Sequence, residues 1–372
     1  MPVRFGVLLP AIDDGIGDAC RRIEAQGWDF LTTGEHVSFN IPIANAFISL
    51  AAAAAATSTI ELMSSVTLLP LYPAVLAAKL GAALDNVSGG RFVLGVGVGG
   101  ENPAEFAACG IPPSERGSRT DEALEIIRLL WTQDRVTYAG KYATLENISI
   151  APRPVRTPRP PIWVAGRKEV AMRRAARYGD GWLPYMYSPD MLVRSLEMIA
   201  AERDGQPPIE AGIYLWSCVH EDPAVATDYA MRTLAQTYRQ DFATMAGKYL
   251  AVGDVDYCAG RVLDYIRAGA TRVIFSGACP SSYTGRHLEL LATQVVPAVR
   301  AELAGRPGTV QSADPRQRGG RVWPAGTSPT SWRPWRRRCP ARPRSSRAAG
   351  SSPGPNSTRG PARWRPTCSA PG

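Results

Sequence analysis

Short apolar segments alternate with helical patterns along the first 303 residues, and this repeat limits the fold more than any other feature of the chain. Each apolar segment has the length of a buried strand, and a helical pattern follows nearly every one. Parallel strands that are neighbours in a sheet need such a crossover between them. The predicted strands cover residues 4–10, 29–33, 60–68, 91–100, 161–166, 180–184, 211–219 and 271–277.

Eight strand-and-helix units without a break in composition favour a (β/α)8 TIM barrel over two doubly wound domains. Ser118, three residues before Asp121, is a capping signal for one of the helices, and a last helix is expected over 284–303. A hairpin at 135–150, turning near Ala139 and Gly140, interrupts the alternation.

Active sites of such barrels lie on the loops at the C-terminal ends of the strands. We therefore expect insertions on this face to select the substrate. The loops concerned are residues 34–45, 98–118, 184–188 and 220–250, the last of which is predicted to be helical.

Residues 1–305 form the predicted barrel domain, and residues 306–372 differ sharply from them in composition. The last segment has 14 Arg, no Lys and one acidic residue, so its charge is 14 − 1 = +13, and residues 1–305 carry 9 − 13 = −4. Because it has no Leu, Ile, Phe, Tyr or Met, we expect it to be a disordered Arg/Pro/Ser/Gly-rich tail.

The basic tail has two interpretations. Its Arg and Trp residues could bind nucleic acid through charge and stacking. The abrupt loss of Lys, Glu and Leu instead resembles an out-of-frame read of a GC-rich gene, which is the interpretation we favour. We therefore expect no nucleic-acid partner.

Several classes of protein are disfavoured by the sequence. The N-terminus lacks the pattern of a signal peptide, and no apolar run is long enough for a membrane span. The cysteines lie far apart without a C-x-x-C motif, and three histidines are too few for a multi-histidine metal site. We expect a cytoplasmic protein with reduced thiols, no metal and no membrane contact.

The segment GVGVGG at 95–100 contains a formal G-x-G-x-x-G pattern. A dinucleotide-binding turn needs a helix directly after these glycines, and Pro103 with two later prolines is expected to interrupt one. In a barrel the same glycines end a strand, where they allow a flat ring to approach the backbone. Tight packing of the strand is the alternative explanation.

Four segments together resemble the luciferase-like monooxygenase family in order and spacing, over residues 3–303. They are DFLTTGEH, MSSVTLLPLYPAVLAAKLGAALDNVSGGRFVLGVGVGG, ERGSRTDEALEIIRLLW and PPIWVAGRKEVAMRRAARYGDGWLP. The family includes FMN-dependent monooxygenases and oxidoreductases that use coenzyme F420. The resemblance implies a barrel whose C-terminal mouth holds a flavin or deazaflavin ring.

The resemblance also implies cofactor-binding residues. Ser65 and Val66 match the bulge, often with a non-prolyl cis peptide, that presses on one face of the ring, and Gly97 and Gly99 leave room beside it. Three consecutive residues after the fifth strand combine cations with a helix start and would bind the phosphate. They are Gly166, Arg167 and Lys168, and the segment resembling the other side of the ring contains Gly181 and Trp182.

His36, at the end of the second predicted strand, is the leading acid/base candidate, because family members place a similar histidine there. Glu35 precedes it, and Glu101, just after the glycines, is a further candidate. Several deazaflavin dehydrogenases have a Trp a few residues after the histidine, whereas this chain has Val37, Ser38 and Phe39. That difference argues against hydride transfer by the same route.

The leading hypothesis is a monooxygenase that uses reduced FMN and O2 on a small organic substrate. A separate flavin or F420 reductase would supply the reduced cofactor, because no second nucleotide domain is visible, and a homodimer is expected. An F420-dependent hydride-transfer oxidoreductase and a non-catalytic flavin-binding barrel remain as alternatives.

Overall fold

The computed structural model describes residues 2–9, 15–100, 102–238 and 246–305. The predicted tail at 306–372 and the candidate Glu101 lie outside these residues.

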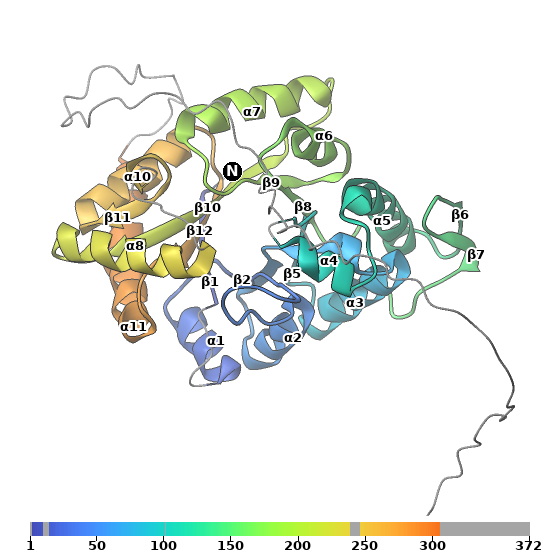
Figure 1. Cartoon of the computed structure of the whole chain (residues 1–372), viewed down its shortest axis with the longest axis horizontal. Coiled ribbons are helices and arrows are strands. Elements are labelled where there is room, and N and C mark those ends of the chain that lie inside the picture. The colour runs from blue at the N-terminus through green and yellow to red at the C-terminus, as the bar shows by residue number, and fades with distance from the viewer. Residues whose placement is uncertain (1, 10–14, 101, 239–245, 306–372) are drawn as a thin grey trace, which may run out of the picture. The chain divides into compact units, whose positions relative to one another are not determined.

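Eight parallel strands close into a ring, which confirms the (β/α)8 barrel (Figure 1). β1 pairs with β2 on one side and with β12 on the other, and β9 pairs with β10, so no open edge remains in the ring. In ring order the strands are β1 (Arg4–Leu8), β2 (Phe30–Thr33), β3 (Glu61–Ser64), β5 (Phe92–Gly97), β8 (Ile162–Ala165), β9 (Gly181–Leu183), β10 (Glu210–Val219) and β12 (Arg272–Gly277).

Helices surround the ring, as Figure 1 shows. They are α1 (Ile16–Ala25), α2 (Ala46–Ala56), α3 (Ala74–Val87), α5 (Arg116–Thr132), α6 (Glu169–Tyr178), α7 (Pro189–Glu202), α8 (Pro223–Tyr238), α10 (Val255–Arg267), α11 (Ser281–Leu290) and α12 (Val296–Ala304). The predicted hairpin is present as β6 (Val136–Ala139) and β7 (Thr144–Ile148).

The structure corrects several boundaries. The third predicted strand is divided at Ser65 and Val66 into β3 and the short β4 (Thr67–Leu68). Ser118 is not a cap, because α5 begins at Arg116 and the Ser118 hydroxyl donates to the Glu115 carbonyl inside the first turn.

Two further differences lie in the insertions. Pro103 opens the short helix α4 (Pro103–Ala108) instead of preventing one, because proline lacks only an N–H that the first helical turn leaves unpaired. The insertion after β10, predicted to be helical, also contains the strand β11 (Ala251–Gly253), which pairs with β10, besides α9 (Ala246–Tyr249). The last helix begins at Ser281 and is interrupted by a π-helical turn at Leu291–Val295.

Trp163 of β8 fills the middle of the barrel, and glycines on β9 and β10 make its position possible. A Cβ atom on Gly181 would lie 2.2 Å from the indole ring, and one on Gly212 would lie 2.8 Å from it. Phe30 has the same relation to Gly6, at 2.4 Å. The barrel interior is therefore a packed core in which large aromatic rings lie against glycines.

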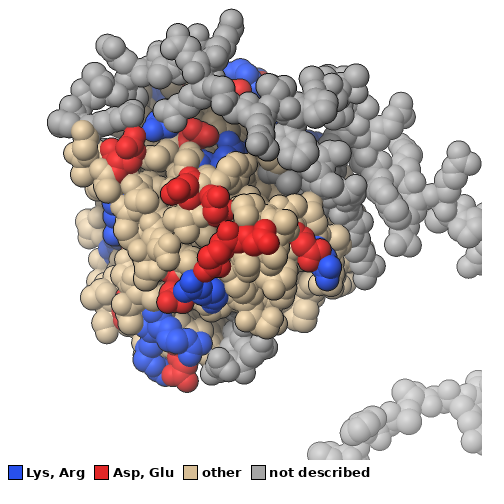
Figure 2. Space-filling model, turned by 90° about the vertical axis from the view of Figure 1, so that its left-hand side faces the viewer, with Lys and Arg blue, Asp and Glu red and all other residues tan. Residues whose placement is uncertain are grey.

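The face that lies to the left in Figure 1 carries charges of both signs (Figure 2). A band of acidic side chains crosses its described surface, and basic side chains lie beside acidic ones. This mixture agrees with the small negative charge of residues 1–305. The described part of this face is therefore not a single basic surface of the kind that nucleic acid requires.

Replacement of Gly181 by Ala tests the packing around Trp163. The added methyl group would overlap the indole ring, so Gly181→Ala should lower the free energy of unfolding by about 1–3 kcal/mol. Gly260→Ala is the matched control, because Gly260 lies within α10 and a Cβ atom there meets nothing within 4 Å. The control should be neutral or stabilising by up to about 1 kcal/mol in denaturant-induced unfolding. Equal stability of both variants would contradict the packing argument.

Candidate active site

The turn between β3 and β4 places Ser65 and Val66 at the C-terminal mouth of the barrel. The peptide bond between them is cis. The Ser65 backbone N–H donates to the Thr33 carbonyl (2.7 Å), and the Thr32 hydroxyl donates to the Ser65 hydroxyl. Both residues stay half-buried, so the turn contributes surface to the mouth.

The glycines at the end of β5 pack against protein atoms. A Cβ atom on Gly97 would lie 2.5 Å from Cγ2 of Val66, and one on Gly99, whose φ is +61°, would lie 2.8 Å from the ring of Phe106. These glycines therefore allow the turn at Val66 and helix α4 to approach β5. Their contact with a flat ring stays a prediction.

Glu35 is a buried anchor that joins three segments. Its carboxylate accepts hydrogen bonds from the Leu68 N–H (2.7 Å), the Ala46 N–H (3.1 Å) and the Tyr72 hydroxyl (2.8 Å). Asn45 Nδ2 donates to the same group (2.9 Å). Burial raises the pKa of Glu35, although the hydrogen bonds from Leu68, Ala46 and Tyr72 oppose the rise. The arrangement suits a positioning role better than proton exchange with a ligand.

His36 is paired with Glu105 of α4, a residue that the sequence analysis did not single out. Nδ1 of His36 lies 3.2 Å from each carboxylate oxygen, and the Val37 N–H donates to the same carboxylate (3.1 Å). The Glu105 side chain is fully buried, while 15% of the His36 side chain is exposed. The signal for Glu105 was local: Asn102 followed by Pro103 is typical of a helix start, and Glu105 lies in that first turn.

Aromatic rings continue from His36 toward β10. Phe39 stacks on His36 with 4.2 Å between the ring centroids, and it meets Tyr238 of α8 edge-on at 6.1 Å. Tyr238 meets Trp216 at 6.0 Å, and Trp216 meets Tyr214 at 5.8 Å. These rings connect the loop after β2 with the end of α8 at the mouth.

The predicted phosphate-binding segment opens α6. Gly166 has a φ of +137°, half-buried Arg167 places its guanidinium 4.6 Å from the ring centroid of Tyr185, and exposed Lys168 occupies the N-cap position without a side-chain capping bond. Trp182 is fully buried and donates from its indole nitrogen to the Gly166 carbonyl (3.0 Å). Trp182 therefore supports the segment from the core side.

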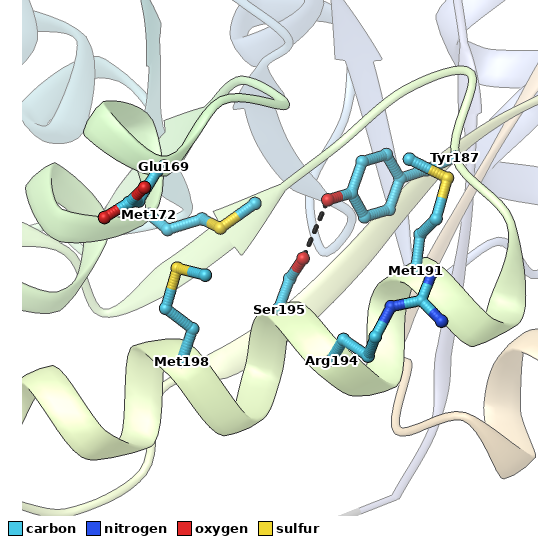
Figure 3. A pocket seen from close by; sticks show the side chains of 7 residues that line it. All are labelled: Glu169, Met172, Tyr187, Met191, Arg194, Ser195 and Met198. Carbon is cyan, nitrogen blue, oxygen red and sulfur yellow. Dashed lines mark hydrogen bonds between the residues drawn. The ribbon is translucent and has the colours of Figure 1, made fainter. Parts of the chain in front are cut away.

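A hollow of about 310 Å3 lies between α6 and α7 (Figure 3). Its lining is mostly apolar, and the Tyr187 hydroxyl and Ser195 hydroxyl in its wall are 2.7 Å apart. The lining residues are Glu169, Met172, Tyr187, Met191, Arg194, Ser195 and Met198. The hollow adjoins the start of α6, but none of the predicted site residues lines it.

The structure brings most of the predicted residues to one end of the barrel. His36, Ser65, Val66, Gly97 and Gly166 all follow or end strands of the ring at their carboxyl ends. Gly181 instead lies in the barrel interior under Trp163. Among the residues that the structure describes, no cluster of His, Cys, Asp and Glu could hold a metal ion.

Comparison with known proteins decides the family. The model of the luciferase-like monooxygenases matches residues 14–272. The chain belongs to this family. It is therefore an oxidoreductase, as the sequence resemblance predicted.

Two relatives show how far the sequence similarity extends. An uncharacterized protein of Mycobacterium tuberculosis is 32% identical over 237 residues, which are 56% of this chain and 83% of the relative. The F420-dependent glucose-6-phosphate dehydrogenase of Kineococcus radiotolerans is 27% identical over 319 residues, 77% of this chain and 93% of the relative.

Solved structures of the family share the fold at lower identity. An F420-dependent secondary alcohol dehydrogenase in complex with an F420-acetone adduct has a TM-score of 0.70 at 22% identity, covering 81% of this chain and 100% of that one. The oxygenating constituent of 3,6-diketocamphane monooxygenase from Pseudomonas putida, in complex with FMN, has a TM-score of 0.66 at 19% identity, with 80% and 98% covered. Within the described part of this family member, no helix is long and apolar enough to cross a membrane.

The raised pKa of Glu35 predicts a pH dependence of stability. Because the folded state favours the protonated carboxyl, the contribution of Glu35 to stability is complete below its ordinary pKa and falls as the pH rises through the higher folded-state pKa. Glu35→Gln should remove this downward slope in free energies of unfolding measured between pH 4 and 8. Glu197→Gln, at an exposed position on α7, is the control and should keep the slope. An unchanged slope in Glu35→Gln would show that Glu35 titrates normally.

Proposed function

We propose that the chain is a monooxygenase that binds reduced FMN at the C-terminal mouth and uses O2 to oxidise a small organic substrate. The observation that carries this proposal is the pairing of a partly exposed His36 with the fully buried Glu105 at that mouth, where a helix start with two cations also lies. When bound, the reduced flavin would supply the two electrons that allow one oxygen atom to enter the substrate and the other to leave as water.

The residues at the start of α6 fit the phosphate of such a cofactor. Free N–H groups and the positive end of the helix dipole favour an anion there. Gly166 has a φ of +137°, a conformation that favours glycine, and exposed Lys168 leaves the helix end uncapped by its side chain. Arg167 and Lys168 would hold the phosphate, and Ser65 and Val66 would contact the ring.

His36 is proposed to hold and transfer a proton at Nε2. A carboxylate beside Nδ1 favours the tautomer in which Nδ1 carries the hydrogen, because that nitrogen then donates to Glu105. Nε2 is left as the basic atom. Glu105 is thus a positioning residue that holds the imidazole, and Glu35 fixes the neighbouring backbone.

The aromatic rings between Phe39 and Trp216 are proposed to exclude water from the reaction. Only 7% of the Trp216 surface remains exposed. Asn40 Nδ2 donates to the Thr237 carbonyl (3.0 Å), which holds the loop after β2 against α8. A dry mouth strengthens electrostatic interactions within it.

Hydride transfer with F420 is the second candidate function, because F420 also carries a phosphate that the start of α6 could bind. The relatives that use F420 support it. The loop has no Trp after the histidine, and Phe39 stacks on His36 instead. This difference from F420-dependent dehydrogenases favours FMN. A flavin-binding barrel without catalysis is the remaining alternative, and in that case the loss of His36 would change nothing.

Partners and location complete the proposal. A separate flavin or F420 reductase would supply the reduced cofactor. A homodimer is proposed because apolar side chains on α2 and α3 are exposed, with Ile48 at 71%, Leu76 at 48% and Val87 at 60%. A cytoplasmic location is proposed because the described cysteines are free thiols.

Titration of the purified protein with FMN and with F420, followed by absorption spectra, tests the cofactor. We expect saturable binding of FMN, and Lys168→Ala should weaken it about tenfold through loss of a charge-assisted contact of about 1.4 kcal/mol. Lys141→Ala, in the exposed turn of the hairpin, is the matched control and should bind normally. Tight binding of F420 alone would favour the second function, and binding of neither would refute the proposal.

Variants of the His36–Glu105 pair test the proton role. His36→Ala should slow the reoxidation of bound reduced FMN in air-saturated buffer by roughly 10²–10⁴-fold. Glu105→Gln removes a charged hydrogen bond of about 1.5–3 kcal/mol, so a loss of roughly 10- to 150-fold is expected. An unchanged rate in Glu105→Gln would contradict the positioning role of Glu105.

A further inference from the structure

Two cysteines that are distant in sequence meet at the mouth of the barrel. Ser217 of β10 is in register with Gly277 of β12, and the Ala278 N–H donates to the Ser217 carbonyl (2.8 Å). Cys218 and Cys279 follow this paired position by one and two residues. The parallel pairing of the two strands therefore fixes the backbone on both sides of the pair.

Both thiols belong to one buried apolar cluster. They are close enough for the charge state of one to affect the other, and Sγ of Cys279 lies 3.9 Å from the Thr284 hydroxyl. Cys218 is fully buried and Cys279 is 7% exposed. Trp216, one of the rings at the mouth, belongs to the same cluster.

A hydrogen bond between the two thiols would make them unequal. It lowers the pKa of Cys279, the acceptor, and raises the pKa of Cys218, the donor. Cys279 is therefore the thiol that ionises first, and a thiolate is the nucleophile in thiol oxidation. Burial instead raises the pKa of the nearby Cys258 to about 12 and that of the solitary Cys20 to about 11.

We propose that Cys218 and Cys279 form a reversible disulfide when the protein meets hydrogen peroxide. The Cys279 thiolate attacks one peroxide oxygen, the O–O bond breaks, and with one proton the products are a sulfenic acid and water. The Cys218 sulfur then attacks the sulfenic sulfur, an S–S bond forms, and the hydroxyl leaves with the Cys218 proton as a second water. Two thiols are thus oxidised by two electrons while one peroxide is reduced to two waters.

The disulfide would join the end of β10 to the turn between β12 and α11. Because Trp216 lies two residues before Cys218, the cross-link would act directly beneath the rings at the mouth. The site therefore links the oxidation state of the surroundings to the geometry of the substrate entrance. The chemistry needs only peroxide, so it does not depend on the proposed function.

Peptide mapping of the full-length protein tests the proposal. The reduced protein is treated with hydrogen peroxide, its remaining thiols are alkylated under denaturing conditions, and it is digested with trypsin without reductant. Cys218, Cys258 and Cys279 fall in separate tryptic peptides, 204–232, 249–261 and 273–286. We expect peptides 204–232 and 273–286 to be linked and to separate after addition of dithiothreitol.

Single variants identify the role of each thiol. Cys279→Ser should abolish the linked species, while Cys218→Ser should leave Cys279 as a sulfenic acid that dimedone traps. Cys20→Ser, at a buried cysteine outside the cluster, is the control and should retain the link. Two outcomes of the wild-type experiment would overturn the proposal: a link to peptide 249–261 instead, or an alkylatable Cys279 at peroxide levels that oxidise the exposed Cys109.

Discussion

Arg272 is the residue on which the closed barrel depends most. It begins β12, the strand that completes the ring by pairing with β1. It donates to Glu61 at the start of β3 and from Nε to Glu210 at the start of β10 (3.0 Å). Its guanidinium lies 4.9 Å from the ring centroid of Trp163 and 5.5 Å from that of Phe30. Burial opposes the charge, but Glu61 and Glu210 raise the pKa of Arg272 above its usual value. Since loss of one partner of a buried pair typically costs about 3–5 kcal/mol, this cluster holds the N-terminal end of the barrel together.

The closed end determines where chemistry can occur. Above the charged layer, Trp163 and Phe30 occupy the space that Gly181, Gly212 and Gly6 leave free, so no channel passes through the barrel. The barrel interior therefore has no room for a ligand, and active sites of such barrels lie at the C-terminal mouth. There polar groups such as the Tyr214 and Ser276 hydroxyls, 3.0 Å apart, replace the apolar packing. Along each strand, residues near the N-terminal end therefore serve stability, and residues near the C-terminal end are available for function.

The sequence predicted the barrel because the apolar runs of buried strands and the periodicity of helices are local patterns, which one sequence is enough to show. The helix opened by Pro73 and closed by Gly89 was predictable for the same reason. The contacts between segments were not. Nothing near Gly97 indicates that Val66 fills the space beside it, and the pairing of Glu105 with His36 joins residues that are 69 positions apart. β11 was missed because a strand of three residues, Ala251–Gly253, has too short a pattern and depends on pairing with β10.

His36 and Glu35 are neighbours in sequence, yet the structure uses them in opposite ways. Successive side chains at a strand end point in different directions, so Glu35 turns into the protein and His36 toward the mouth. The Glu35 carboxylate binds the start of α2 and β4 and thereby fixes the backbone from which His36 extends. Glu105 fixes the imidazole from the other side and is itself held by α4. Two buried carboxylates from different segments thus fix the position of the partly exposed His36 ring.

Burying two acidic groups is unfavourable unless they are fully hydrogen-bonded. A histidine that only fills the core would not require both carboxylates. The free-energy cost of burying them is consistent with a role in orienting the His36 ring, because reactive groups must be held by a rigid supporting shell.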